Sequence, residues 1–294
     1  MFATLLGPLP RPPLPDDAGP TELLRAVVRA QETAGLEPVT DGGFGVGATP
    51  AERWQATARL TDRPVKAVLT GPCSRGQATT TPEAATDATI DAVRAELLEL
   101  LAAGCAFVEV HEPAATRIGS DEVARARFRD AQERLLDGVS GIHMSLAITG
   151  GNADQAGTDT LLAAPYASLA LDLIDGPDNW RLVVATPGDR GVICGAISAD
   201  PHADDRPEVL LWAAGYAAST GGRGPTRVGL ATASSLAHVP WDVALRKLGI
   251  LGEAARLADL PPAERVRAVD PRSLDSRSAA LGRYVPRRRR GVDR

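Results

Sequence analysis

The chain has 294 residues, enough for one large α/β domain or two ordinary ones, and its formal net charge of −5 excludes an overall basic surface for nucleic acid or anionic membranes. Its three cysteines are far apart and lack metal-ligand spacing, so we expect a reducing, cytoplasmic location and no disulfide framework. No apolar run approaches the roughly 20 residues needed to cross a bilayer, and the first residues lack the basic start of a signal peptide.

Short apolar segments alternate with helical patterns along the chain. Eight segments bounded by turn residues predict strands, at 2–6, 37–40, 65–69, 106–110, 142–149, 168–173, 191–197 and 227–231. Patterns between them predict helices at 21–34, 50–60, 82–103, 120–136, 159–164, 208–219 and 242–257. In the third of these helices, Thr81 is the expected cap and Pro82 the first residue. Eight alternating units without Asn-Gly hairpins predict the fold class α/β, as a single (β/α)8 TIM barrel.

The strand at 106–110 ends on two adjacent titratable residues, His111 and Glu112. In parallel α/β sheets ligands collect outside the carboxyl ends of strands, so these residues are candidate catalytic groups. Asp41 and Asp172 also follow apolar strands, which makes them further candidates for polar or acid–base roles. The alternative that Glu112 and Asp41 cap loops, with His111 as a solvated turn residue, stays open.

The end of the chain differs from the rest in composition. Residues 1–260 are expected to form the barrel, whereas residues 261–294 are rich in arginine and poor in aromatic residues. Such a run could bind anions or nucleic acid, but our interpretation is a basic, flexible tail. Abundant alanine, glycine and arginine with little lysine are typical of a GC-rich bacterial genome.

Five motifs occur in order at the strand ends and in the last helix: Gly7 to Arg11, Val39 to Gly42, Val65 to Pro72, Val108 to Ala114 and Asp242 to Leu248. Together they resemble motifs of the cobalamin-independent methionine synthase family, in particular single-barrel versions related to its C-terminal catalytic half, within the wider group that includes uroporphyrinogen decarboxylase. The resemblance covers residues 1–258 and implies a TIM barrel. It also implies transfer of a methyl or alkyl group to a thiol-type acceptor.

The chemistry of that family depends on one zinc ion, which binds the thiol substrate and lowers its pKa. The family ligands are a His-x-Cys pair, a glutamate and a final cysteine. At the matching positions this chain has Ala147 and Thr149 for the pair, Asp172 for the glutamate and Ser234 for the cysteine. Because a catalytic zinc needs about three protein ligands, we expect the family zinc site to be lost and predict no cofactor.

The substrate side of the resemblance differs as well. Pro8, Gly43 and His111 stand where the family motifs have a serine, a glutamate and an aspartate. The acidic residues hold the amino group of an amino-acid thiol in the family, and an imidazole would do so poorly, so homocysteine is not the expected substrate. The candidate substrate-binding residues are Gly7, Pro8, Gly71, Cys73, Asn152 and Ser234.

Three functions stay open on this basis. The resemblance implies a methyl or alkyl transferase acting on a small thiol-type acceptor, without the family zinc and without the N-terminal half of the full-length enzymes. A metal-free lyase or decarboxylase could use His111, Glu112, Asp41 and Asp172 as acid and base groups. A non-catalytic homologue could bind a small molecule or a partner protein. We expect a small-molecule substrate and neither a membrane nor a nucleic-acid partner, and no sequence feature indicates an oligomeric state.

Overall fold

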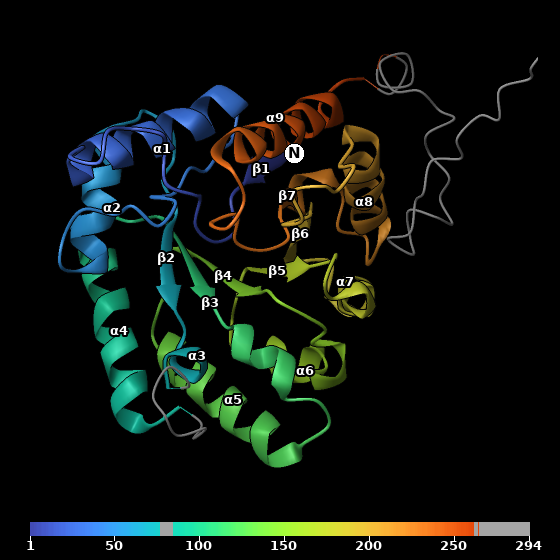
Figure 1. The fold of residues 1–294 in the computed structure, drawn as a ribbon. Coiled ribbons are helices and arrows are strands. Elements are labelled where there is room, and N and C mark those ends of the chain that lie inside the picture. The colour runs from blue at the N-terminus through green and yellow to red at the C-terminus, as the bar shows by residue number, and fades with distance from the viewer. Residues whose placement is uncertain (77–84, 262–263, 265–294) are drawn as a thin grey trace, which may run out of the picture.

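A curled parallel sheet organises the chain (Figure 1). The computed structural model describes residues 1–76, 85–261 and 264. Within them the sheet has seven strands in the spatial order β1-β7-β6-β5-β4-β3-β2, and each neighbouring pair is parallel. The strands are β1 (Phe2–Thr4), β2 (Ala67–Thr70), β3 (Phe107–His111), β4 (His143–Ile148), β5 (Ser168–Asp172), β6 (Gly191–Ile197) and β7 (Val228–Thr232).

Helices follow the strands and surround the sheet, as Figure 1 shows for α4, α5, α8 and α9. The α-helices are α1 (Pro20–Ala34), α2 (Pro50–Ala58), α3 (Pro72–Gly76), α4 (Asp87–Ala102), α5 (Glu122–Leu136), α6 (Thr158–Leu161), α7 (Trp180–Ala185), α8 (Pro207–Ser219) and α9 (Trp241–Ala258). Short 3-10 turns are η1 (Pro113–Arg117), η2 (Asp154–Ala156), η3 (Pro177–Asn179) and η4 (Pro225–Arg227). Among the described residues, no helix is both long and apolar enough to span a membrane.

Local sequence signals explain most helix ends. Gly35 ends α1 in the left-handed conformation, at φ 84°, as expected for a glycine after a helix. Thr81 and Pro82, which were expected to begin the next long helix, lie outside the described residues, as does nearly all of the basic C-terminal segment. Within the described part, α4 begins at Asp87, after Thr86, whose side chain accepts a hydrogen bond from an amide of the first turn.

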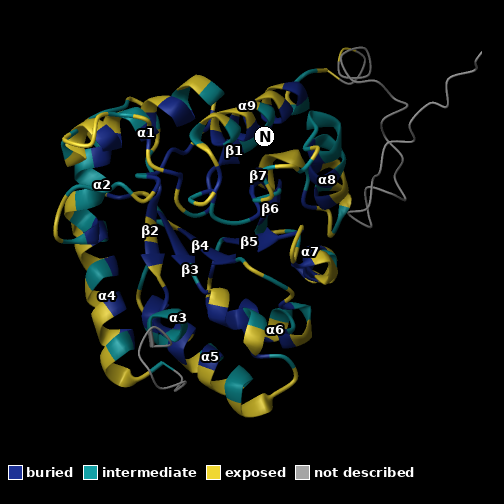
Figure 2. Cartoon of the chain, viewed as in Figure 1, coloured by how far each residue is buried: buried dark blue, intermediate teal, exposed yellow. Residues whose placement is uncertain are grey.

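The strands alternate between two faces, and this alternation positions the site. On β3, Val108 and Val110 join the large core between the sheet and the helices. Glu109 and His111 therefore point to the opposite face, which we call the inner face. A second apolar cluster fills part of the inner face with the side chains Leu6, Ala147, Ala170, Ile193 and Ala231. Figure 2 shows the strands buried along most of their length.

The predicted strand at residues 37–40 forms only two isolated bridges, one between Ala3 and Glu37 and one between Val39 and Val65. The amide of Glu37 donates a hydrogen bond to the carbonyl of Ala3 at 2.8 Å. The segment thus contacts both β1 and the residues leading into β2, but the proline at its second position has no amide hydrogen with which to continue a ladder. The other seven predicted strands are present, with ends that differ from the expected ones by at most two residues.

Candidate functional site

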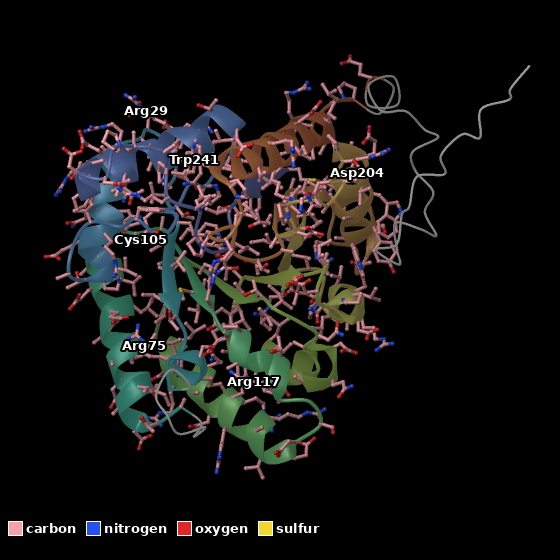
Figure 3. All side chains as sticks on the ribbon, in the orientation of Figure 1. Arg29, Arg75, Cys105, Arg117, Asp204 and Trp241 are labelled. Carbon is pink, nitrogen blue, oxygen red and sulfur yellow. The ribbon has the colours of Figure 1, made fainter. Side chains whose placement is uncertain are left out.

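All but one of the predicted site residues lie at one end of the sheet, at or just beyond the ends of strands; we call this end the carboxyl edge. Figure 3 labels Cys105 before β3 and labels Arg75 and Arg117 on the segments after β2 and β3, which distinguishes the two ends. The residues at the carboxyl edge, in chain order, are Gly7, Pro8, Gly71, Cys73, His111, Glu112, Asn152, Asp172 and Ser234, whereas Asp41 follows the bridged segment 37–40.

The side chain of Glu112 is completely buried and receives four hydrogen bonds. Its Oε1 accepts from the Cys73 amide at 3.0 Å and from Gln132 Nε2 at 2.7 Å. Its Oε2 accepts from the Ser74 amide at 2.8 Å and from the Ser74 hydroxyl at 2.6 Å. Burial raises the pKa of Glu112, although these donors oppose the shift. The carboxylate therefore ties the end of β3 to the first turn of α3 and to α5.

The surroundings of Glu112 are tightly packed. Gln132 Oε1 accepts a hydrogen bond of 2.6 Å from the hydroxyl of Tyr166, which is also completely buried. A Cβ at Gly71 would lie 2.3 Å from the Glu112 carboxylate, so the turn after β2 passes directly against it. Burial, and after it the charge of Glu112, raises the pKa of the Cys73 thiol. That thiol therefore stays protonated near neutral pH, where it is a poor nucleophile.

Asp172 has similar surroundings at the end of β5. Its Oδ1 accepts hydrogen bonds from two amides of the following turn, both at 2.9 Å, and its Oδ2 accepts from the Gly150 amide at 3.0 Å. Burial raises the pKa of Asp172 against the effect of these bonds. Asn152 is exposed in the loop after β4, and its side chain accepts a hydrogen bond from the Asp178 amide at 2.8 Å. Asp172 and Asn152 thus join the loops that follow β4 and β5.

The turn at Gly7 and Pro8 packs against the loop after β7. Gly7 has φ 78°, and a Cβ there would lie 2.9 Å from Ser235 Cα, so glycine is needed for both conformation and space. The carbonyl of Pro8 accepts a hydrogen bond from the Leu236 amide at 2.9 Å. Ser234 lies in the same loop and is partly exposed. The first and last strand ends are therefore in direct contact.

Asp41 lies beside a small cavity of about 20 Å³ near the start of β2. The cavity lining also includes Trp54, Lys66 and Val68. Asp41 Oδ1 accepts a hydrogen bond from the Gly43 amide at 2.9 Å, which shapes the turn that follows. A cavity of this size holds about one water molecule and no organic substrate.

His111 lies on the inner face, with 15% of its side chain exposed. Its Nε2 is 2.8 Å from Glu109 Oε1, and the same oxygen accepts a hydrogen bond from Lys66 Nζ at 2.8 Å. Lys66 Nζ also donates to the carbonyl of Leu5 at 3.1 Å. Burial alone would raise the pKa of Glu109, but the Lys66 charge and the His111 imidazole outweigh it and lower that pKa. Glu109 is therefore an ionised carboxylate between two nitrogen groups.

Sequence reasoning did not single out Lys66, Glu109 and Ser145 as site residues. Ser145 is the register partner of Glu109 on β4. Glu109 Oε2 and Ser145 Oγ are both buried without a hydrogen-bond partner among the described residues. The available signal was the alternation of β3, Phe-Val-Glu-Val-His, because a charged residue at every second position of an apolar strand indicates a polar opposite face.

A cavity of about 1110 Å³ opens at the opposite end of the sheet, among the strand starts and α9. Its lining includes Phe2, Phe107 and His143 but none of the predicted site residues. In parallel α/β sheets and barrels, catalytic groups follow the carboxyl ends of strands, so we assign the candidate site to the carboxyl edge and not to this cavity. Within residues 1–76, 85–261 and 264, no three His, Cys, Asp or Glu side chains come together as a metal site.

Comparison with known sequences identifies relatives. No protein-family model matches the sequence. A 5-methyltetrahydropteroyltriglutamate–homocysteine methyltransferase from Rhodopseudomonas palustris (strain TIE-1) is 31% identical over 212 residues, which are 64% of this chain and 25% of that relative. The chain thus spans about a quarter of the length of the curated relatives that it matches first.

Solved structures share the fold. A B12-independent methionine synthase from Shewanella sp. W3-18-1, in complex with selenomethionine, has a TM-score of 0.71 at 16% identity, over 91% of this chain and 99% of that chain. A methyltransferase from Methanosarcina mazei has a TM-score of 0.57 at 13% identity, over 87% of this chain and 94% of that chain. The chain is therefore similar in sequence to a homocysteine methyltransferase over 64% of its length, and similar in fold to a B12-independent methionine synthase over 91% of its length.

Proposed function

We propose that this chain is a methyltransferase-like (β/α)8 barrel that binds a small thiol at its carboxyl edge and works without the family zinc ion. The homocysteine methyltransferase relatives support methyl transfer to a thiol. The curled seven-stranded sheet supports the barrel, in which residues 37–40 would take the eighth position between β1 and β2. The zinc-free part rests on one observation, which is the set of side chains at the ligand positions.

These side chains do not suit zinc. Zinc in proteins is bound by thiolate, imidazole and carboxylate groups, and a catalytic site uses about three of them. Ala147 has no donor atom, and Thr149 and Ser234 carry only neutral hydroxyls. Asp172 is the single carboxylate of the set, and three backbone amides already donate to its oxygens. The proposed reaction therefore needs no zinc ion.

The proposed thiol carries no α-amino group. An ammonium group needs an available carboxylate to bind, and Glu112 and Asp172 are both occupied by fixed donors. Glu109 is completely buried, and its Oε1 already accepts hydrogen bonds from Lys66 and His111, so it is not accessible to an ammonium group. Mercaptopropionate has a thiol and a carboxylate but no amino group, so we expect it to bind more tightly than homocysteine.

Two measurements test this function. Elemental mass spectrometry of protein purified without chelators, before and after zinc addition, should give far less than one zinc per chain. Calorimetry should show saturable binding of mercaptopropionate, and mass spectrometry should detect its S-methyl product when 5-methyltetrahydropteroyltriglutamate, the donor in the name of the relatives, is supplied. One tightly held zinc per chain would overturn the zinc-free part, and the absence of thiol binding would overturn the choice of acceptor.

A matched pair of variants locates the binding site. Thr70 ends β2, is exposed, and is the register partner of His111, so Thr70→Tyr should fill the inner face and weaken thiol binding at least tenfold. Thr226 is exposed at the other end of the sheet, so Thr226→Tyr should leave binding unchanged. Equal binding by the two variants would move the site away from the carboxyl edge and favour the large cavity at the amino end.

A further inference from the structure

The contact between His111 and Glu109 determines which ring nitrogen is available to a ligand. Glu109 Oε1 also receives Lys66 Nζ at 2.8 Å, and the side chains of Glu109 and Lys66 are both completely buried. An ionised carboxylate only accepts hydrogen bonds, so the proton in the 2.8 Å contact belongs to His111 Nε2. Nδ1 then holds the free electron pair of the neutral ring, and it makes no hydrogen bond to a residue of the described part.

The residues paired with His111 on the neighbouring strands have short side chains. Thr70 pairs with His111 on one side, and Thr70 and Val68 are exposed even though the alternate residues of β2 are buried. Ala147 pairs with His111 on the other side, and Ala170 pairs with Ala147 on the next strand. The strands flanking the imidazole therefore present short side chains beside a ring that is 15% exposed.

We infer that His111 is the base that takes the proton of the bound thiol, a role that rests on the proposed function. The S–H bond breaks, its electron pair stays on sulfur, and the proton moves to Nδ1. The resulting imidazolium keeps its Nε2–H bond to Glu109, whose negative charge stabilises it. Lys66 holds Glu109 in place and ionised. The step conserves atoms and charge and needs no further reactant.

Glu109 is essential to this step as a positioning residue. An unperturbed imidazole is a weaker base than a thiolate by roughly two pKa units, so a free thiol and a free imidazole would both stay neutral. The buried, ionised Glu109 carboxylate lies 2.8 Å from Nε2 and attracts a protonated ring, because attraction between opposite charges is stronger away from water. Glu109 Oε2 has no hydrogen-bond donor among the described residues, which leaves more of the carboxylate charge to act on the imidazolium.

The experiment compares thiolate formation in matched variants. Ultraviolet absorbance of bound mercaptopropionate reports the thiolate, and calorimetry in two buffers of different protonation enthalpy reports protons released to solvent. The native protein should form thiolate without releasing a proton. His111→Asn should lower the thiolate signal at least tenfold, as should the double variant Lys66→Met/Glu109→Gln, which removes both buried charges together. His238→Asn, at an exposed position in the loop after β7, should have no effect.

The outcomes separate this inference from the proposed function. Mercaptopropionate that binds without forming thiolate, or thiolate that persists in His111→Asn, would overturn the role of His111 and leave thiol binding intact. No binding by the native protein would overturn the proposed function and the inference together. Nitrogen-15 NMR of the ligand-free protein tests the ring directly. The His111 signal should show the Nε2–H tautomer, and an Nδ1–H tautomer would refute the inference whichever ligand binds.

Discussion

Replacing Glu112 by alanine should strongly destabilise the fold, because the carboxylate serves four buried or partly buried donors. Glu112→Ala leaves the amides of Cys73 and Ser74, the Ser74 hydroxyl and Gln132 Nε2 without their acceptor. A stranded buried donor costs about 1–3 kcal/mol. Removing the buried charge recovers part of that loss, since burial raises the pKa of Glu112. We expect a net loss of about 4 kcal/mol in the free energy of unfolding.

Urea unfolding followed by tryptophan fluorescence measures this change. Ser74→Ala removes only one side-chain donor and should cost about 1 kcal/mol. Glu99→Ala, at an exposed position on α4, is the matched control and should change the free energy of unfolding by less than about 0.5 kcal/mol. If Glu112→Ala proved as stable as Glu99→Ala but lost function, the carboxylate would belong to the chemistry and our account of it as an anchor would be refuted.

Two further stability measurements test the packing and the buried ion pair. Gly71→Ala places a Cβ 2.3 Å from the Glu112 carboxylate and should lower the free energy of unfolding by about 3 kcal/mol. At Gly104, with φ 88° and no atom within 4 Å of the added Cβ, the same change should lower it by about 1 kcal/mol. Urea unfolding of the two variants shows whether Gly71→Ala is the less stable one. The lowered pKa of Glu109 means that its carboxylate stabilises the fold above an unfolded pKa of about 4.3, and that this stabilisation is lost as the pH falls through the lower folded value. Lys66→Met/Glu109→Gln should lack that acid dependence in unfolding curves at a series of pH values.

The fold was predictable because its signals are local. Each strand of the sheet is a short apolar run between turn residues, and Gly35 ends a helix for a reason that sequence alone supplies. The segment at 37–40 has the same apolar pattern, but the proline within it lacks an amide hydrogen, and the segment forms only two isolated β-bridges. The cap of α4 shows a second limit. Thr86 and Thr81 are equally good capping residues by type, and within the described residues it is Thr86 that caps the helix.

The roles of the site residues were less predictable because they depend on partners far away in sequence. Glu112 was expected to be either catalytic or a loop cap, and the choice depends on Gln132 on α5 and Ser74 after β2, which no local pattern connects to it. The partner of His111, in contrast, was only two positions away. Strand alternation places Glu109 on the same face, so the Glu-x-His spacing on an apolar strand carried more information than the adjacent His-Glu pair.

The position of a residue at the end of a strand does not show that it is catalytic. The number of hydrogen bonds that the surrounding chain donates to it distinguishes a group that exchanges protons from one that holds loops together. Glu112 and Asp172 both end buried strands, and each carboxylate accepts at least three hydrogen bonds from its own framework. Both oxygens of Glu112 already accept two hydrogen bonds, so a proton there would displace one of its donors, at about 1–3 kcal/mol. His111 breaks no bond when Nδ1 receives a proton, and it keeps its contact with Glu109. Proton chemistry at the carboxyl edge should therefore pass through His111, while the carboxylates hold the loops that form the site.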